Sequence, residues 1–290
     1  MKAYQNALGL LPAELRTRGE ALPKELWSQV EELRLRAGRP PTVVLDSREL
    51  PFPGQGVLTS RDLDRVAEIA TRASLHTAAQ RLRQGWFTAA GGCRIGFCGT
   101  VQLREETPHS FGTLSSLNLR LHRQHPGCGE GVWKALLREG KPCSALILGP
   151  PGGGKTTLLR DLCRLAGKTL RVGLCDERGE LAALRQGIPQ FDVGERTDVL
   201  EGCPKDKGLL LLLRGMNPEV LACDEITDPA DAQALARCGN CGVRLLATLH
   251  AQGEADLTAK PLGRELLDRG LFQKLVVGQA RSWKVVEPPW

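Results

Sequence analysis

Apolar and polar positions follow a regular rhythm in the second half of the chain. Short apolar runs typical of buried strands alternate with stretches of helical apolar spacing. These elements fall at 145–148, 158–165, 170–175, 181–186, 208–213, 219–223, 230–237 and 243–248, and a closing β-hairpin is expected over 271–277 and 282–286. Because strands and helices alternate, this half is predicted to be an α/β domain with a parallel sheet covered by helices.

The first half has a mixed pattern. The expected elements are partial helix over 12–36, a strand at 42–46, one or two helices over 59–83, a strand pair over 85–103 and a further strand at 115–121. Gly91-Gly92 is a hairpin-type turn with β-prone flanks, which is why we expect a strand pair there. A small α+β domain is therefore predicted to precede the α/β domain.

A turn-rich stretch, His125 to Gly129, separates the two halves. Proline and glycine concentrate in it, and few contacts need to cross such a segment. A chain of 290 residues is long enough for each half to bury its own core. We therefore expect an N-terminal domain over 1–126 and a second domain over 127–290.

Charge and hydropathy narrow the class of protein only slightly. The net charge of +6 permits contact with nucleic acid or an anionic membrane but demands neither, and charges of both signs are mixed. The leucine run at 209–213 stops at Arg214, far short of a membrane span. Charged residues interrupt the first twenty positions, so we expect no secretory signal.

The chain has 10 cysteines, most of them in stretches that are predicted to be core. Only Cys238 and Cys241 have metal-like spacing, and no second pair completes four ligands. We therefore expect reduced cysteines that act as small apolar residues, no zinc, and the cytosol as the compartment.

The strongest chemical signal is a glycine-rich loop between the strand at 145–148 and the helix at 158–165. It comprises Gly149, Pro150, Pro151, Gly152, Gly153, Gly154, Lys155, Thr156 and Thr157. This matches the phosphate-loop pattern of Gly, four residues and Gly-Lys-Thr, in which backbone N–H groups and a helix N-terminus converge on a phosphate. Lys155 would reach the β/γ-phosphates and Thr156 would place its hydroxyl on Mg²⁺.

Two carboxylates end the predicted strand at 219–223. Since the carboxyl edge of such a sheet faces the ligand, Asp224 would hold Mg²⁺ and Glu225 would polarise an attacking water. A small-molecule kinase has no need of the second acid, and the Asn-Lys-x-Asp guanine reader of GTPases is absent. The pair therefore favours an Mg²⁺-dependent ATPase.

Two other predicted strands end in polar residues. The run at 170–175 leads into Asp176 and Glu177 and lies between the two motifs along the chain. A strand inserted between the phosphate loop and the Asp-Glu strand marks the ATPase division that includes RecA-type recombinases, AAA-type motors and secretion motors. The strand at 243–248 ends in Thr248, which would sense the γ-phosphate, and His250 lies just beyond it.

Arginines can stabilise γ-phosphate charge from a neighbouring subunit, an effect worth about 10³–10⁵ in rate. Arg196 and Arg214 are the candidates in the second half, and Arg94 and Arg120 in the first. We therefore expect ATP to promote a closed oligomer.

These segments together resemble the stage III sporulation protein AA family of endospore-forming bacteria, which is related to the ring-forming ATPases of type II and type IV secretion systems. Matching stretches are 32–40, 91–96, 115–120, 149–160, 196–205, 214–225 and 247–251. By this resemblance Asp176 and Glu177 take the place of the acidic box, with Asp176 a further candidate Mg²⁺ ligand. His250 takes the place of the histidine box, and Arg120 takes the place of an N-domain arginine that approaches nucleotide. Thr227 stands where the pattern has glycine.

The resemblance implies a hexameric ATPase in the cytoplasm of the mother cell. It would act at the base of a membrane channel to the forespore, with other membrane proteins of the stage III A operon as partners. One alternative is a nucleic-acid-associated phosphate-loop ATPase, although Trp86-Phe87 is the only adjacent aromatic pair available for base stacking. The other is a nucleotide-binding scaffold without turnover, and Glu225 argues against it.

Overall fold

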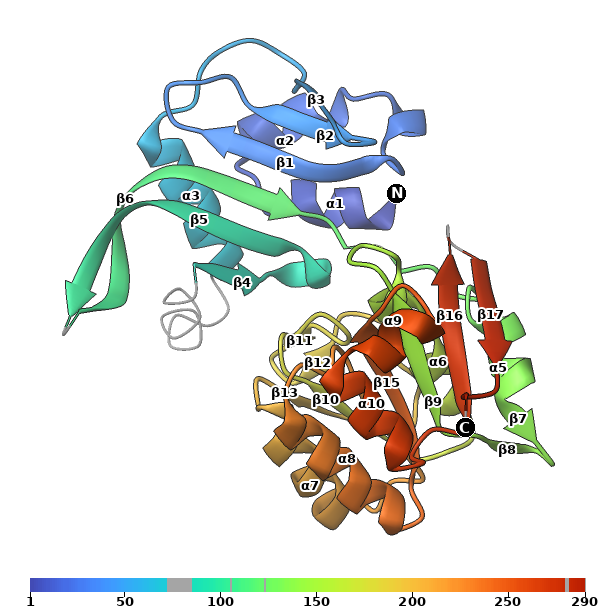
Figure 1. Ribbon diagram of the computed structural model, residues 1–290. Helices are drawn as coiled ribbons and strands as arrows, with labels where there is room; N and C mark the ends of the chain where they lie inside the picture. The colour runs from blue at the N-terminus through green and yellow to red at the C-terminus, as the bar shows by residue number, and fades with distance from the viewer. Residues whose placement is uncertain (72–84, 105, 123, 280–281, 290) are drawn as a thin grey trace. The chain divides into compact units, whose positions relative to one another are not determined.

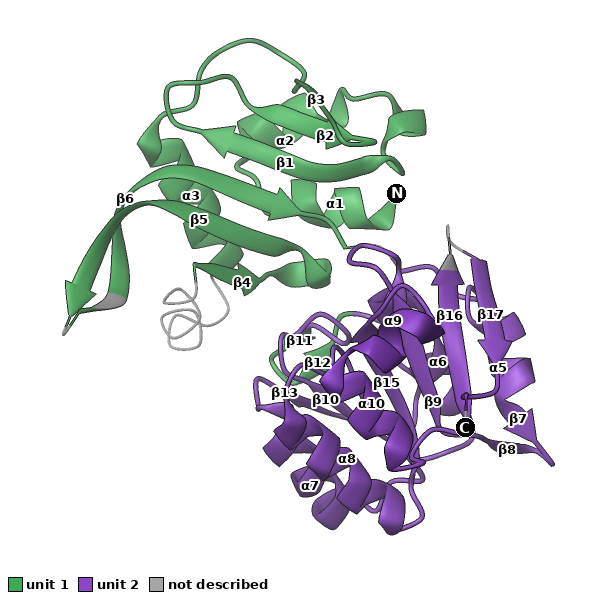
Figure 2. Ribbon diagram, in the orientation of Figure 1, with its two compact units in different colours: residues 1–123, 184–190 green, residues 124–183, 191–290 purple. Residues whose placement is uncertain are grey.

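The structure of the protein is a computed structural model that describes residues 1–71, 85–104, 106–122, 124–279 and 282–289. The chain forms two compact units, coloured separately in Figure 2. Unit 1 comprises residues 1–123 and 184–190, and unit 2 comprises residues 124–183 and 191–290. The short hairpin of β11 (Leu184–Arg185) and β12 (Ile188–Pro189) thus belongs to unit 1 although its neighbours in the chain belong to unit 2.

Unit 1 is built on a six-stranded antiparallel sheet in the order β3-β2-β1-β6-β5-β4. Its strands are β1 (Val30–Arg36), β2 (Thr42–Leu45), β3 (Arg48–Pro51), β4 (Trp86–Thr88), β5 (Arg94–Arg104) and β6 (Thr107–Arg120). The α-helices in the described part of unit 1 are α1 (Lys2–Leu8), α2 (Ala13–Glu20) and α3 (Ser60–Thr71), which carries Leu63 and Val66 into the core. Unit 1 is therefore the expected small α+β module.

The expectation of partial helix over 12–36 is confirmed by α2, and the last part of that range is the strand β1. Leu33 and Leu35 are buried while Arg34 and Arg36 between them are not, which is the period of two of a strand with one buried face. Only the earlier part of the range is helical. The turn expected at Gly91-Gly92 links β4 to β5, and both glycines have positive φ, of 70° and 74°. The part of the 59–83 helix beyond residue 71 lies outside the described residues.

Unit 2 contains a seven-stranded sheet in the order β13-β10-β14-β15-β9-β16-β17 (Figure 1). The strands are β9 (Ala145–Gly149), β10 (Val172–Asp176), β13 (Thr197–Glu201), β14 (Val220–Cys223), β15 (Arg244–His250), β16 (Lys274–Gln279) and β17 (Ser282–Val286). Every neighbouring pair is parallel except β16 with β17, the expected closing hairpin. All residues of β9, β10 and β14 are buried, as in strands covered on both faces.

Helices cover this sheet on both faces. They are α5 (Glu130–Leu136), α6 (Lys155–Ala166), α7 (Lys205–Met216), α8 (Pro229–Asn240), α9 (Glu254–Ala259) and α10 (Pro261–Asp268), with the small hairpin of β7 (Leu137–Arg138) and β8 (Lys141–Pro142) after α5. A buried cluster joins Leu146 and Leu148 of β9 to α7 and α8, and α6 packs on the other face. At the start of α8, the Asp228 side chain accepts from the Ala230 backbone N–H at 2.8 Å, in a capping box that fixes where the helix begins.

Most elements expected in this half are present, with two differences. Residues 181–186 contain only β11 instead of a regular element of that length, and β13 was not expected at all. All five residues of β13 are only partly buried. An edge strand of this kind needs only a short apolar run, which is why the sequence pattern missed it. Among the described residues, no helix is both long and apolar enough to cross a membrane.

Candidate nucleotide-binding site

The glycine-rich loop connects the carboxyl end of β9 to the start of α6. Gly152 and Gly154 have φ values of 70° and 88°, a left-handed region in which a side chain would be strained. Gly154 is the N-cap of α6, and Lys155 is its first residue. The loop therefore turns the chain so that the N-terminus of α6 opens toward the edge where the strands end.

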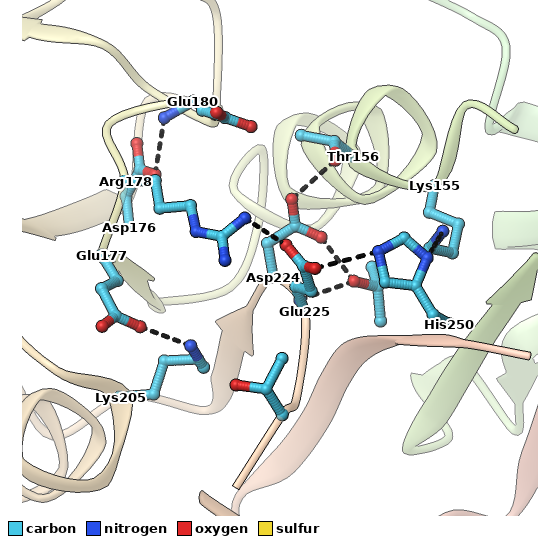
Figure 3. Close-up of polar contacts among 12 residues, drawn as sticks. Lys155, Thr156, Asp176, Glu177, Arg178, Glu180, Lys205, Asp224, Glu225 and His250 are labelled. Atoms are coloured by element: carbon cyan, nitrogen blue, oxygen red, sulfur yellow. Dashed lines mark hydrogen bonds and ion pairs between the residues drawn. The ribbon is translucent and has the colours of Figure 1, made fainter. Parts of the chain in front are cut away.

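Lys155 is 6% exposed, and its ammonium group is held at the foot of the loop. Nζ donates to the carbonyl oxygens of Gly149 at 2.9 Å and Pro150 at 2.8 Å, and it lies 2.8 Å from Nδ1 of His250 (Figure 3). Burial lowers the pKa of Lys155, although the carboxylates of Asp224 and Glu225 oppose this shift. The loop thus holds a partly desolvated cation beside two acids.

The contacts of His250 fix its tautomer. A lysine ammonium group has three donors and no acceptor, so Nδ1 of His250 accepts from Lys155. The proton of a neutral ring is then on Nε2, which lies 2.9 Å from Oε1 of Glu225 and donates to it. His250 therefore links the phosphate-loop lysine to Glu225, the residue that we expected to polarise water.

Asp224 follows β14 and is held by two hydroxyl groups. Thr156 Oγ1 donates to Oδ2 at 2.6 Å, and Thr248 Oγ1 donates to Oδ1. Thr248 also accepts from the Glu225 backbone N–H at 2.7 Å and is fully buried. The Thr248 hydroxyl therefore orients the Asp224 carboxylate, and its role as a γ-phosphate sensor stays a prediction.

Glu225 adopts a left-handed backbone conformation, with φ of 55°, at the end of β14. Its carboxylate receives the His250 contact on Oε1, while Nη1 of Arg178 donates to Oε2 at 2.5 Å. Sequence reasoning missed Arg178. The available signal was its position directly after the Asp176-Glu177 pair, at the strand edge that also carries Asp224.

The strand order explains how the two motifs meet. β15 lies between β9 and β14 and is parallel to both, so the loop and the acids are two strands apart. β10 lies between the two motifs only along the chain, because in space it is on the far side of β14. The inserted strand is therefore β15, the strand that carries Thr248 and His250.

Asp176 faces the protein interior instead of the phosphate loop. It is 3% exposed, and its carboxylate accepts backbone N–H groups of Glu180, Leu181 and Ala182 at 2.8–3.0 Å. Burial raises the pKa of Asp176, although these backbone donors oppose the shift. These hydrogen bonds close the turn after β10. Asp176 therefore has a structural role, and it is a poor Mg²⁺ ligand because backbone donors already occupy its carboxylate oxygens.

Glu177 also points away from the phosphate loop. Its carboxylate forms an ion pair with Lys205, the first residue of α7, whose Nζ lies 3.9 Å from the buried Asp231. Figure 3 shows this contact on the opposite side of Asp224 from the Lys155–His250 contact. The structure therefore separates Glu177 from the cluster of Lys155, His250 and Glu225.

The two candidate arginines of unit 2 lie away from the cluster. Arg196 precedes β13, where Nη1 donates to the Thr169 carbonyl at 2.6 Å, and Arg214 lies in the last turn of α7. Both are therefore at the edge where the strands begin. Arg94 and Arg120 pair across β5 and β6 of unit 1, and the Arg94 guanidinium lies 3.7 Å from the centroid of the Trp86 ring.

The cysteines of the described structure are all free thiols. Burial raises the pKa of Cys93 and of Cys163 to about 12, so these two thiols pack as apolar groups and are unreactive. Cys238 is buried and Cys241 is exposed. No group of three or more His, Cys, Asp or Glu side chains with metal-binding geometry occurs within the ranges that the structure describes.

The donors at the loop fit Mg²⁺ and a nucleoside triphosphate. Mg²⁺ prefers oxygen ligands and takes only one or two from the protein, and Thr156 Oγ1 and Asp224 Oδ2 lie together at the N-terminus of α6. Lys155 supplies the cation and the loop supplies backbone N–H groups. A strand, phosphate loop and helix, with one strand inserted before the acid-bearing strand, define the fold as a phosphate-loop NTPase of the additional-strand class.

The chain belongs to the family described as sporulation stage III, protein AA, whose sequence profile matches residues 3–284. It is 33% identical over 271 residues to stage III sporulation protein AA of Bacillus subtilis (strain 168), covering 91% of this chain and 87% of that protein. The family predicted from the sequence motifs is therefore confirmed.

Solved structures of a pilus retraction motor and of an ATPase share the fold. The pilus retraction motor PilT with bound ADP superimposes with a TM-score of 0.59 at 16% identity, covering 92% of this chain and 82% of that one. The Legionella pneumophila ATPase DotB gives a TM-score of 0.55 at 17% identity, with 86% and 72% covered. These similarities confirm the predicted fold class.

Proposed function

We propose that the protein is an Mg²⁺-dependent ATPase that forms a ring and drives or gates a membrane-associated transport complex in sporulation. The observation that carries this proposal is the continuous contact from Lys155 through His250 to Glu225, beside the Thr156–Asp224 contact. Family membership supports the sporulation role, and the fold supports nucleotide chemistry. The mother cell is the proposed location, with membrane proteins of the stage III A operon as partners.

Each residue of the cluster has a distinct task in this proposal. Lys155 pairs with the β/γ-phosphates, while Thr156 and Asp224 hold Mg²⁺, which neutralises charge on those phosphates. Glu225 polarises the attacking water, and His250 donates from Nε2 to keep that carboxylate oriented. A phosphate bound by Lys155 would replace His250 as a partner of the Lys155 ammonium group. Because His250 also contacts Glu225, occupancy of the loop would be transmitted to Glu225.

Turnover in this proposal needs a cation from a neighbouring subunit. Arg196 and Arg214 belong to the edge of the sheet opposite the phosphate loop, so they can approach a γ-phosphate only across a subunit boundary. Arg94 and Arg120 of unit 1 are the other candidates, and Arg120 has a 63% exposed side chain. A closed ring, which we propose is a hexamer, would place such an arginine beside every nucleotide.

Two measurements test this function. The first is the specific ATPase activity over a hundredfold dilution of the protein, and the second is the mass of the assembly with and without ATP. The proposal predicts an ATP-promoted oligomer and activity that rises steeply with protein concentration. Lys155→Ala subunits mixed with subunits lacking the trans arginine should partly recover turnover. A monomer with flat specific activity would contradict the ring. Strong stimulation by single-stranded DNA that is lost at high salt would instead support the nucleic-acid-associated alternative.

A further inference from the structure

A second concave site lies on unit 2 at the edge where the strands begin. It is a groove of about 870 Å³ between the end of α7, the end of α8 and the starts of β10, β14 and β15. Figure 1 shows α7 and α8 side by side along this part of the sheet. The phosphate loop is at the other edge, so this groove, which we call the basal groove, is separate from the nucleotide site.

The basal groove is strongly cationic. The charged residues that line it are Lys141, Arg171, Arg214, Glu219, Arg237 and Arg244, five cations and one acid, for a net charge of +4. Arg171 lies 3.5 Å from Glu219, so that pair is internally balanced. Within the described ranges, the other four cations form no ion pair. Arg214 is a candidate trans arginine of the proposed ring, so the charge of Lys141, Arg237 and Arg244 is what remains available to an anionic partner.

The lining between these cations is apolar. Leu210 and Leu213 of α7 and Val243 before β15 contribute to it. A surface of this kind gains free energy when apolar side chains cover it.

We propose that the basal groove docks an amphipathic helical segment of a partner protein whose polar face is acidic. Such a helix places leucine-type side chains on the apolar floor and carboxylates beside Arg237, Arg244 and Lys141. A bilayer is flat and does not match a concave site. Nucleic acid is disfavoured because no aromatic residue lines the groove to stack on a base.

Binding of a labelled peptide to the full chain tests this surface without any need for nucleotide. The probe is a fluorescein-labelled helical peptide with leucine at i, i+3, i+4 and i+7 and glutamate on its polar face, followed by anisotropy. The double substitution Arg237→Glu with Arg244→Glu should weaken binding about tenfold or more, and added salt should weaken binding to the parent chain. Arg214 is left unchanged because the proposed ring gives it another role.

The matched control is Arg264→Glu with Lys284→Glu, an equal change of charge on exposed residues of unit 2 away from the groove. It should change the affinity by less than about twofold, since long-range charge effects are screened by salt. Arg237→Gln with Arg244→Gln should give an intermediate loss. Thermal unfolding of each variant shows whether it is folded. Equal loss in the control, or no binding of the peptide to the parent chain, overturns the proposal.

Three further ligands decide the class of partner. A peptide with glutamine in place of each glutamate should bind weakly, because the carboxylates are the recognised groups. Vesicles of anionic phosphatidylglycerol and single-stranded DNA should bind more weakly than the acidic peptide. If either binds more tightly and loses affinity with Arg237→Glu and Arg244→Glu, the partner class is wrong. If those changes abolish self-association of the chain instead, the groove's occupant is a second copy.

Discussion

The ends of β10 and β14 carry the same dipeptide in very different surroundings. These neighbouring parallel strands finish in Asp176-Glu177 and Asp224-Glu225 at one edge of the sheet, and each pair has a lysine nearby that is 6% exposed. Backbone N–H groups hold Asp176, whereas hydroxyl groups hold Asp224. The donor type therefore separates a carboxylate that closes a turn from one that is available to a metal ion.

The same contrast extends to the two lysines. Lys205 forms an ion pair with Glu177 and lies near Asp231, so its charge is neutralised within the fold. Lys155 has two carbonyl oxygens and a neutral imidazole as direct partners, and none of these carries a negative charge. A phosphate would gain more from Lys155 than from Lys205. Proximity of acids and a lysine is thus insufficient to define a nucleotide site.

The largest expected effect is on hydrolysis at the two glutamates. Glu225→Gln should lower the ATPase rate about 10²–10⁴-fold, because the amide cannot polarise water, while nucleotide binding is retained. Glu177→Gln should lower the rate by less than about fivefold, since the Lys205 ion pair that it weakens is remote from the loop. Steady-state phosphate release and equilibrium binding of a fluorescent ATP analogue measure both. A normal rate in Glu225→Gln would show that the assigned base is wrong.

The next effect is on nucleotide affinity at the two lysines. Lys155→Ala should weaken ATP binding about 100-fold, because it removes charge-assisted bonds to phosphate worth about 3 kcal/mol. Lys205→Ala should leave affinity within about threefold but lower the unfolding midpoint, because Asp231 remains buried without its cation. Calorimetric titration and urea unfolding give the two readouts. If both variants lost affinity for ATP equally, the distinction between the ends of β10 and β14 would be wrong.

A smaller effect is expected on folding stability at the two aspartates. Asp176→Ala should reduce the free energy of unfolding by about 2–4 kcal/mol, because backbone donors in the turn lose their acceptor. Asp224→Ala should cost less stability but raise the Mg²⁺ concentration needed for hydrolysis. Urea unfolding and magnesium titrations compare them. A larger loss of stability in Asp224→Ala would reverse the assignment.

The sequence predicted the parts of the site that are encoded locally. The glycine-rich loop and the Asp224-Glu225 strand end both depend on short, contiguous patterns, and the structure brings them together through β15. Two features depend on residues far apart in the chain: the Thr248 hydroxyl on Asp224 and the Arg178 contact with Glu225. Side-chain partners of this kind follow from strand order, which a one-dimensional pattern does not contain.

The fold was likewise predictable where its elements are encoded in short, local apolar patterns. Fully buried strands such as β9 and β14 stand out as apolar runs, whereas β13 at the edge of the sheet is only partly buried and was missed. In unit 1, the Val30–Arg36 strand alternates leucine with arginine over a few residues. That alternation was hidden because the stretch before it is helical.

The position of the metal ion tests the central claim most directly. A crystal of the Glu225→Gln chain grown with Mn²⁺ and ATP would locate the metal by its anomalous scattering. The account predicts one peak bound by Thr156 Oγ1, with Asp224 beside it directly or through water, and with Lys155 on the phosphates. A peak beside Asp176 and Glu177, or triphosphate bound away from the glycine-rich loop, would contradict it.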